Sequence, residues 1–500
     1  LPQIQEYERT STTVVNAYIR PVVESYVTSL VKRMRRLGLG IPLTIMQSSG
    51  GVLPANLAAA NPVYIIESGP AAGVVGTQRM GGLLGLGDLV VLDMGGTTAK
   101  ASLIRDGKFS IVPESEVGGD SVGHRLLQGA GYPIQVPTID IVEVGAGGGS
   151  IATVDAAGGF QVGPRSAGAV PGPVGYALGG DQPTVTDANL VLGYLNPVAL
   201  GGGNLTLDEK GARAALTDLG ARINRSDTDT AYGVHLIANA NMMRALSSVS
   251  SERGVDPSGL TLVAIGGSGG IHAVGLAESL GIRRLLVPPT AGLFSALSLL
   301  FADLEHHLVR AYYRPMADTT PDDFNAAVQP LVDEVHRLLD SEGFKDVARR
   351  EIEIEVNIKY SGQTWTLPVS CTAFPVDTTQ MAALVEDFGA AHDQQYGYRS
   401  DNEALQLVSL GVIGRGIPAT PRLPDRVARA QEWIAESGER KAFYGPDHGW
   451  LDTAVLPRAG LGMEAIEGPL IVEEYDTTIV VRPGWRASLD SWNNIVVERT

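Results

Sequence analysis

A short apolar strand that runs directly into a glycine-rich turn is the feature that most constrains the fold of this chain. Residues 88–92 read Asp-Leu-Val-Val-Leu, and Asp93, Met94, Gly95, Gly96, Thr97 and Thr98 follow. The apolar run is typical of a buried strand. The two glycines let backbone amides approach an anion, and the threonine hydroxyls add donors. We interpret the turn as a phosphate-binding loop. The alternative is an ordinary hairpin with a glycine-rich turn.

The residues beyond the turn separate it from other phosphate-binding loops. Residues 100–104 resume an extended pattern, so the unit is predicted to be a strand, a tight turn and a returning strand. A Walker-type loop, in which the strand enters a helix, is therefore excluded. Asp93 would repel a phosphate, and we expect it to bind a bridging cation, Mg²⁺ (or Mn²⁺).

Composition limits the partners and the location that we expect. The chain has 500 residues, of which 44% are hydrophobic, so it can bury a large core in two to four domains. A net charge of −17 argues against binding to nucleic acid or to an anionic membrane surface. No apolar stretch has the length of a membrane-spanning helix. Cys371 is the only cysteine, which favours a reducing, cytoplasmic location.

A second glycine-rich turn follows a predicted strand over residues 260–265 and precedes a predicted helix over residues 271–280. The turn consists of Gly266, Gly267, Ser268, Gly269 and Gly270. Its spacing differs from the GxGxxG dinucleotide fingerprint, so a Rossmann assignment is weak. A turn with so little side-chain volume could instead admit the flat face of a purine.

The rest of the chain alternates between predicted helices and strands, which favours an α/β domain with a mixed sheet. We predict helices over residues 23–37, 231–250, 324–339 and 381–391 and strands over residues 42–46, 63–66, 284–287, 352–360, 468–472 and 478–481. The pattern changes beyond about residue 305. We therefore predict a core over residues 1–315 and a C-terminal α+β domain over residues 316–500.

Residues 303–307 carry acidic and histidine side chains that could bind a metal. We predict a helix there, on which His306 and His307 point in different directions, so a solvated face is favoured over a metal site.

In this order, the two glycine turns resemble those of the hydantoinase A/5-oxoprolinase family, whose core belongs to the actin, Hsp70 and sugar-kinase superfamily with a ribonuclease H-like fold. The resemblance is carried by residues 6–12, 67–73, 93–97, 140–150, 163–173, 184–189, 266–272, 360–363 and 396–398. It implies an α/β, mixed-sheet nucleotide-binding core followed by a C-terminal α+β domain.

By the same resemblance, residues 93–98 are the second phosphate motif and residues 266–270 the adenosine motif of an ATP site. The first phosphate motif is expected ahead of Leu1, in a missing N-terminal domain, or on a separate chain. Family members often carry Asp at the position of Lys100. This lysine could bind phosphate or an acidic substrate group, or it could lie at the strand surface.

The resemblance implies one of two ATP-dependent reactions, the opening of cyclic amides (hydantoins, oxoproline or lactams) or the carboxylation of ketones. In both, a substrate oxygen attacks the γ-phosphoryl group, and the protein aligns the reactants and neutralises charge. The amide reaction is the leading hypothesis. The alternatives are a ketone carboxylase subunit and a structural subunit that binds nucleotide without turnover.

Three acidic residues, Asp140, Glu143 and Asp187, are candidates for general-base or metal duty, and each could equally fix a loop by accepting backbone hydrogen bonds. With Lys100 they complete the predicted catalytic set. The sequence contains no Ser-His-Asp, Cys-His or HExxH arrangement, and His272 is expected to pack or cap a helix. The resemblance therefore implies a hydantoinase B-type partner subunit that bears the metal site.

Overall fold

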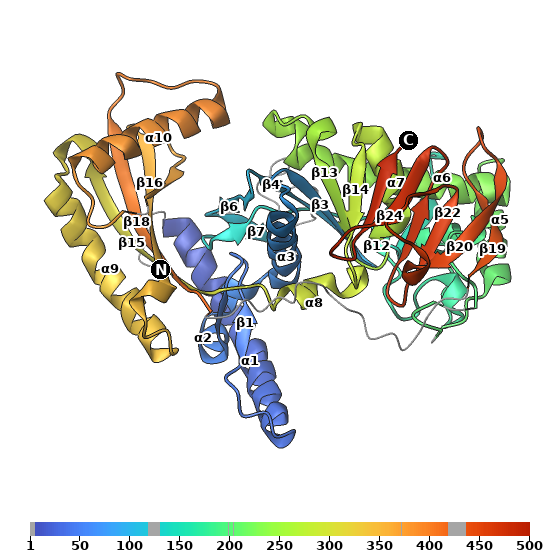
Figure 1. Cartoon of the computed structure of the whole chain (residues 1–500), viewed down its shortest axis with the longest axis horizontal. Helices are drawn as coiled ribbons and strands as arrows, with labels where there is room; N and C mark the ends of the chain where they lie inside the picture. Colours follow the sequence, from blue (N-terminus) through green and yellow to red (C-terminus); the bar gives the residue numbers. More distant parts are fainter. Residues whose placement is uncertain (1–5, 119–130, 199, 204, 372, 419–436) are drawn as a thin grey trace.

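The computed structural model describes residues 6–118, 131–198, 200–203, 205–371, 373–418 and 437–500. A six-stranded sheet with its two helices forms one end of the molecule, and a nine-stranded sheet with most of the remaining helices forms the other (Figure 1). The long helix α1 extends away from both. The helices are α1 (Glu6–Arg36), α2 (Ala55–Ala60), α3 (Ser68–Leu84), α4 (Val185–Val191), α5 (Glu209–Ala221), α6 (Asp227–Val249), α7 (Gly269–Leu280), α8 (Phe294–Ser298), α9 (Pro321–Ser341) and α10 (Thr378–Tyr396).

The nine-stranded sheet is mixed, as predicted for the core. Its three central strands run parallel, and the flanking strands on both sides are antiparallel to them. The order is β10 (Val142–Val144), β4 (Ala99–Arg105), β3 (Leu89–Met94), β13 (Thr261–Ile265), β14 (Arg284–Val287), β25 (Ile495–Arg499), β24 (Trp485–Leu489) and β21 (Ile466–Glu467), with β5 (Lys108–Phe109) paired to β4.

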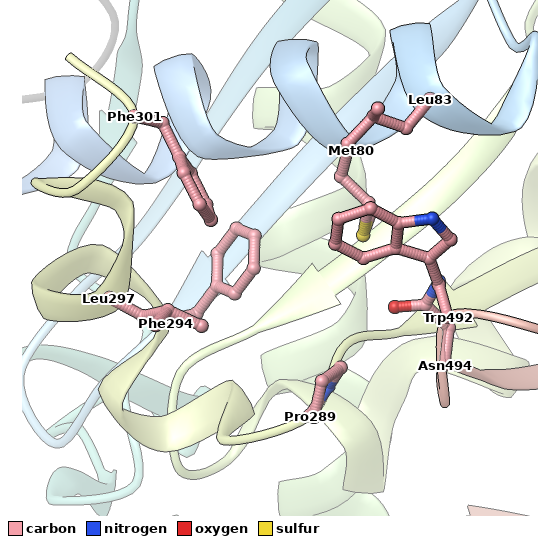
Figure 2. A pocket seen from close by; sticks show the side chains of 8 residues that line it. All are labelled: Met80, Leu83, Pro289, Phe294, Leu297, Phe301, Trp492 and Asn494. Carbon is pink, nitrogen blue, oxygen red and sulfur yellow. The ribbon is translucent and has the colours of Figure 1, made fainter. Parts of the chain in front are cut away.

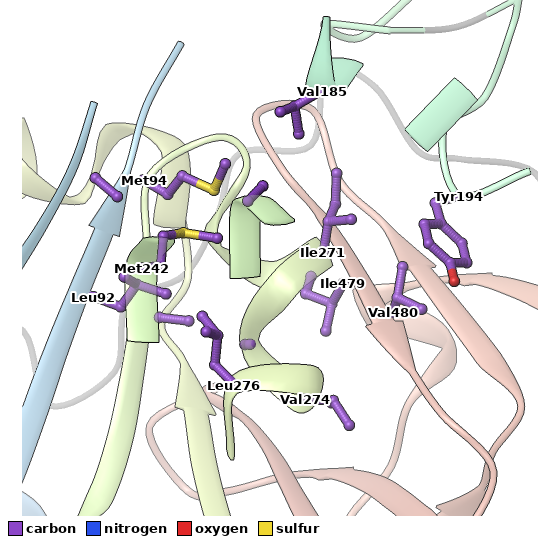
Figure 3. Packing of buried hydrophobic residues seen from close by; sticks show 14 of the residues in the cluster. Leu92, Met94, Val185, Tyr194, Met242, Ile271, Val274, Leu276, Ile479 and Val480 are labelled. Carbon is purple, nitrogen blue, oxygen red and sulfur yellow. The ribbon is translucent and has the colours of Figure 1, made fainter. Parts of the chain in front are cut away.

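Helices cover both faces of this sheet, which explains why β3 reads as a continuous apolar run. Leu92 and Met94 point to one face and join the core formed with α4, α6 and α7. Figure 3 shows Leu92 and Met94 near Met242 on one side of α7, and Ile479 and Val480 of the C-terminal strands on its other side. Leu89 and Val91 point to the other face and pack with α3. Asp93 follows the same alternation and lies on the α3 side.

Two predicted units around the glycine turns are confirmed. β3 and β4 form an antiparallel hairpin, with Met94 opposite Ala99. The second unit runs from β13 through the glycine turn into α7, which ends at Gly281 (φ +71°) and is followed by β14. The positive φ at this C-terminal position suits glycine.

The six-stranded sheet lies beside α9 and α10, at the left of Figure 1. Its order is β1 (Thr44–Met46), β2 (Val52–Pro54), β15 (Leu304–Pro315), β18 (Leu405–Gly416), β16 (Arg350–Tyr360) and β17 (Leu367–Cys371). The predicted helices over residues 324–339 and 381–391 and the predicted strand over residues 352–360 correspond to α9, α10 and β16.

Smaller sheets complete the described fold. A four-stranded sheet has the order β19 (Gly438–Phe443), β20 (Trp450–Pro457), β22 (Leu470–Glu473) and β23 (Thr478–Val481). The two-stranded pairs are β11 (Ser150–Val154) with β12 (Phe160–Ser166), β6 (Ile111–Val112) with β9 (Thr138–Ile139), and β7 (Ser115–Val117) with β8 (Tyr132–Ile134).

Two local predictions are wrong. Residues 304–307 belong to strand β15, not to a helix, because they pair along their length with β18. Glu305 and His306 are buried on this strand rather than on the expected solvated face. His306 contacts Glu342, which follows α9, while His307 contacts Glu305. The predicted strand over residues 63–66 is mostly a 3₁₀ helix, Pro62–Ile65. The fixed φ of a proline suits the first turn of a helix.

The division of the chain at residue 315 stays a prediction. β15 ends at Pro315 and shares its sheet with later strands, β16 to β18. Beyond residue 437 the chain returns to the other end of the molecule, where β25 pairs with β14. Residues from both predicted domains therefore contribute to the same sheets.

Candidate functional site

A glycine-rich loop at residues 145–149 holds the turn between β3 and β4 in place. The N–H groups of Gly148 and Gly149 donate to the carbonyl oxygens of Gly95 (3.0 Å) and Gly96 (2.6 Å). A Cβ atom on Gly147 would lie 2.5 Å from the backbone nitrogen of Thr97, so only glycine fits there. The glycines of this loop therefore serve contact between two loops.

The turn at residues 266–270 meets the same hairpin from the other side. The N–H of Ser268 donates to the carbonyl oxygen of Met94 (3.1 Å). Gly266 has a φ of +81°, and a Cβ atom there would lie 2.3 Å from that oxygen. The two predicted motifs, distant in sequence, are thus in direct contact at the ends of neighbouring strands.

The glycine turns border a cleft of about 420 Å³. This volume lies within the roughly 300–1,000 Å³ of small-molecule sites. Gly95, Gly96, Thr97, Gly267 and Ser268 of the predicted set line it. Thr186 and Asn189 of α4, Ile271 of α7, and residues 473–478 also line it, together with the apolar side chains of Leu195 and Leu200.

The mouth of the turn offers hydrogen-bond donors in open space. Among the described residues, the N–H groups of Gly96 and Thr97 donate to no protein acceptor. A Cβ atom on Gly95 or Gly96 would meet nothing within 4 Å. Consecutive backbone amides that point into such a space form a binding site for an anion.

Charged side chains form a row on the other side of this turn, facing α3. Asp93, Lys100 and Glu143 lie directly opposite one another on β3, β4 and β10. The Nζ atom of Lys100 is 3.1 Å from the Glu143 carboxylate and 3.6 Å from that of Glu67, which precedes α3. Ser295 of α8 lies 3.5 Å from the Asp93 carboxylate. We call these five residues the polar row.

Burial and the neighbouring charges together shift the pKa values of two members of the polar row, Asp93 and Lys100. Burial raises the pKa of Asp93, and Lys100 and Ser295 offset part of that rise. Burial lowers the pKa of Lys100, but the carboxylates of Glu67 and Glu143 more than compensate and raise it above its ordinary value. Lys100 is therefore a firmly held cation and is unsuited to act as a base near neutral pH.

None of the three acidic candidates, Asp140, Glu143 and Asp187, is among the residues that line the cleft. Asp140 forms an ion pair with Arg253. Asp187 is fully buried and accepts hydrogen bonds from the N–H groups of Val174 (3.2 Å), Gly175 (2.7 Å) and Thr184 (2.8 Å). It also completes the capping box of α4. This geometry supports the loop-fixing interpretation of Asp187.

A separate apolar crevice near α3 and α8 is too small for a ligand of this kind. Its volume is about 10 Å³, roughly the space of a single water. Figure 2 shows Met80 of α3, Phe294 of α8 and Trp492 converging on it. None of the described residues that line this crevice is charged. The cleft at the glycine turns is therefore the candidate site.

Sequence reasoning missed several parts of the site. Glu67 adopts a left-handed φ of 63° at the start of α3, and its contact with Lys100 depends on tertiary structure. Residues 473–478 come from the C-terminal part of the chain and carry no local signal of a binding function. Glu143 was a candidate from the sequence, but its contact with Lys100 was not predicted. The alternation of residues 140–144 was the available signal, because it places the Glu143 side chain on the same face of the sheet as Lys100.

Together, the mixed sheet, the β3–β4 hairpin and the β13–α7–β14 unit define an α/β protein with an actin- and sugar-kinase-like core. Residues 9–308 match the Hydantoinase/oxoprolinase family, and residues 317–499 match the Hydantoinase/oxoprolinase C-terminal domain. The chain therefore belongs to the hydantoinase/oxoprolinase family, as its sequence motifs predicted.

Relatives with named activities fall into both reaction classes. The caprolactamase subunit alpha of Pseudomonas jessenii is 35% identical over 98% of this chain and 69% of its own length. The acetophenone carboxylase gamma subunit of Aromatoleum aromaticum is 30% identical over 99% of this chain and 68% of its own length. The crystal structure of the ATP-dependent caprolactamase from P. jessenii superposes with a TM-score of 0.83, at 34% identity, over 100% of this chain and 71% of that one.

Within the described residues, no helix combines the length and apolar character needed to cross a membrane.

Proposed function

We propose that this chain is the ATP-binding subunit of an enzyme that opens cyclic amides, such as hydantoins, oxoproline or lactams, after phosphorylation of the substrate carbonyl oxygen. The observation that carries the proposal is the convergence of the two glycine turns on one cleft, with the polar row beside it. Similarity to caprolactamase over nearly the whole chain supports the cyclic-amide class.

The cleft has the chemistry that ATP requires. The unpaired N–H groups of Gly96 and Thr97 suit phosphate oxygens, and the hydroxyls of Thr97 and Thr98 lie at the same turn. Gly267 and Ser268, with the apolar side chain of Ile271, suit a nucleoside. When bound, ATP supplies the phosphoryl group that activates the amide oxygen.

Asp93 is the residue that we assign to Mg²⁺ (or Mn²⁺). A magnesium ion at a nucleotide site commonly uses one or two carboxylates and takes its other ligands from phosphates and water, so a single aspartate at the turn fits this donor set.

Lys100 does not itself line the cleft, and we assign it to charge neutralisation from behind the phosphate turn. Its cation lies beside Asp93 and is held by Glu67 and Glu143, so its side chain is oriented without a ligand. Because its pKa is raised, it keeps its charge near neutral pH. Glu143 then acts as a positioning residue for Lys100.

Lys100→Met tests this assignment. We expect the KM for ATP to rise about tenfold or more, because a hydrogen bond to a charged group is worth roughly 1.5–3 kcal/mol. Steady-state kinetics with ATP and organic substrate varied in turn measure the effect. A rise confined to the KM of the organic substrate would instead assign Lys100 to an acidic group on that substrate.

Hydrolysis of the activated amide is assigned to a partner of the hydantoinase B type. The caprolactamase and acetophenone carboxylase relatives are both named as subunits.

A ketone carboxylase subunit is the second candidate function, supported by the similarity to the acetophenone carboxylase gamma subunit. Reconstitution of the complete complex separates the candidates. ADP release is measured with hydantoins, oxoproline and lactams alone, and with ketones plus bicarbonate. We expect release with a cyclic amide. Release only with ketone and bicarbonate would contradict the amide proposal, and a complete complex that binds nucleotide but releases no ADP with either class of substrate would favour a structural subunit.

A further inference from the structure

Four buried side chains form a closed ring of hydrogen bonds behind the cleft, which we call the His–Asn ring. It consists of Asn189 on α4, His235 and Asn239 on α6, and His272 on α7. Asn189 Oδ1 lies 2.9 Å from His235 Nδ1, and Asn189 Nδ2 lies 3.2 Å from His272 Nε2. Asn239 closes the ring, with Oδ1 2.6 Å from His272 Nδ1 and Nδ2 3.3 Å from His235 Nε2.

The placement of the two amides sets the protonation of the two histidines. Each asparagine oxygen accepts from the Nδ1–H of one histidine, and each asparagine nitrogen donates to the Nε2 of the other. Both imidazoles are therefore neutral Nδ1–H tautomers. Rotating one amide alone would place two donors or two acceptors against each other, so Asn189 and Asn239 fix one another's orientation through the histidines.

The surroundings keep both rings neutral. The imidazoles stack with a centroid distance of 4.5 Å. Burial lowers the pKa of His272 to about 3, and burial, His272 and Arg482 lower the pKa of His235 well below its ordinary value. The other groups facing the ring are Tyr194 and Tyr232 against His235, and Glu278, which pairs with Arg482. None of these supplies an anion in contact with either imidazole.

Asn189 connects this ring to the cleft that it lines. Thr186, one helical turn earlier on α4, donates to the carbonyl oxygen of Gly148 (2.8 Å), whose N–H in turn contacts the phosphate turn. Asn189 therefore lies one turn, about 5 Å, farther along the helix from that contact. Ile271, which precedes His272 on α7, lines the cleft as well.

The Asn189 amide has one hydrogen to spare. Its nitrogen carries two hydrogens, and one is used by His272. Among the described residues no acceptor receives the second. A buried donor without a partner costs free energy, and an acceptor on a bound ligand would remove that cost.

We propose that Asn189 donates this hydrogen bond to an acceptor on the nucleoside part of the bound nucleotide, and that His235, Asn239 and His272 are positioning residues that hold its amide in one orientation. This inference rests on the proposed function, since it takes the ligand of the cleft to be ATP. The inference adds Asn189 to the proposed ATP site as a residue that selects the nucleoside, whereas the turn at residues 95–98 is proposed to bind the phosphates.

The test compares ATP, adenosine and inorganic tripolyphosphate by calorimetric titration of the complete complex. For Asn189→Ala, we expect the affinities for ATP and adenosine to fall about 3- to 10-fold, the usual range for one hydrogen bond, and the affinity for tripolyphosphate to stay unchanged. His272→Phe keeps the stacked ring but removes the acceptor, and should weaken ATP and adenosine binding in the same way. His392→Gln, at a buried histidine on α10, is the matched control and should bind all three as the wild type does.

The outcomes separate this inference from the proposed function. A wild type that binds neither ATP nor adenosine overturns both. A wild type that binds ATP, with Asn189→Ala unchanged or weakened equally for tripolyphosphate, overturns only the role of Asn189.

Nitrogen-15 NMR of the histidine side chains tests the positioning role without any substitution, so it decides even if the variants do not fold. Nδ1–H tautomers are expected for His235 and His272, and adenosine should shift the side-chain amide signal of Asn189. An imidazolium or an Nε2–H tautomer in the ring, or no shift with adenosine, would contradict the proposal.

Discussion

The two sides of the β3–β4 turn are built on different principles. On the side of α4 and α7, seven glycines line the cleft together with polar and apolar side chains, and the donors at the turn itself are the peptide N–H groups of Gly96 and Thr97. On the side of α3, the polar row consists of charged side chains that contact one another. Binding in the cleft should therefore depend on space for the backbone, whereas the polar row should respond to the loss of any one charge.

The largest expected effect is in the polar row. Asp93→Asn should lower Mg·ATP-dependent turnover about 100-fold or more, because the assigned metal ion contributes several kcal/mol of charge stabilisation. Folding should be preserved, since burial already raises the pKa of Asp93 and a neutral amide suits that environment. Turnover by the reconstituted complex and a thermal melt measure the two parts. Retained turnover would remove Asp93 from the site.

A pair of glycine substitutions tests the backbone side. Gly147→Ala should lower the free energy of unfolding by about 3 kcal/mol, the upper end for overpacking, because its Cβ would meet the Thr97 backbone. Gly96→Ala is the matched control for folding, since its Cβ enters open space, but that space is the proposed phosphate site. Urea denaturation and ATP titration should thus separate the two variants. Equal stabilities would show that the contact between the loops is not tight.

The Asp187→Asn variant tests whether Asp187 fixes a loop or acts as a general base. Asp187→Asn should cost about 2 kcal/mol, because an amide nitrogen would face donors that now share a carboxylate. Turnover of the folded variant should keep the wild-type pH profile. An intact melting temperature with turnover lost would instead return Asp187 to the role of general base.

The smallest effect concerns pH and the His–Asn ring. The pKa of His272 is about 3 in the folded state and near 6.5 when unfolded, so the unfolded state binds more protons between these values. Its contribution to stability is complete above pH 6.5 and is lost progressively as the pH falls, by about 1.4 kcal/mol at pH 5.5. The loss of stability between pH 7 and 5.5 should be smaller in His272→Phe than in the wild type. Equal losses would indicate that His272 is protonated in the fold.

Features that depend on contacts between neighbouring segments of the sequence could be predicted, whereas features that depend on contacts between distant segments could not. The β3–β4 hairpin and the β13–α7–β14 unit could be predicted, because their strands, turns and helix follow one another in the chain. The Lys100–Glu143 contact depends on pairing across 43 positions of sequence, and the Lys100–Glu67 contact on a helix start from another segment.

The wrong prediction at residues 304–307 has the same origin. Two adjacent histidines show neither the apolar periodicity of a helix nor that of a strand. Only their pairing with β18, about a hundred residues later, determines that they form a strand. Residues 473–478 reach the cleft by a similar long return of the chain. Such features depend on tertiary structure, which overrides local propensity.

Hydrogen exchange of the β3–β4 turn tests the central claim most directly. The N–H groups of Gly96 and Thr97, which have no protein acceptor among the described residues, should exchange quickly in the free protein. Addition of Mg·ATP to the complete complex should slow their exchange, while the peptide covering α10 stays unchanged. Unaltered exchange at residues 95–98 under saturating ATP would contradict the assignment of this turn as the phosphate site.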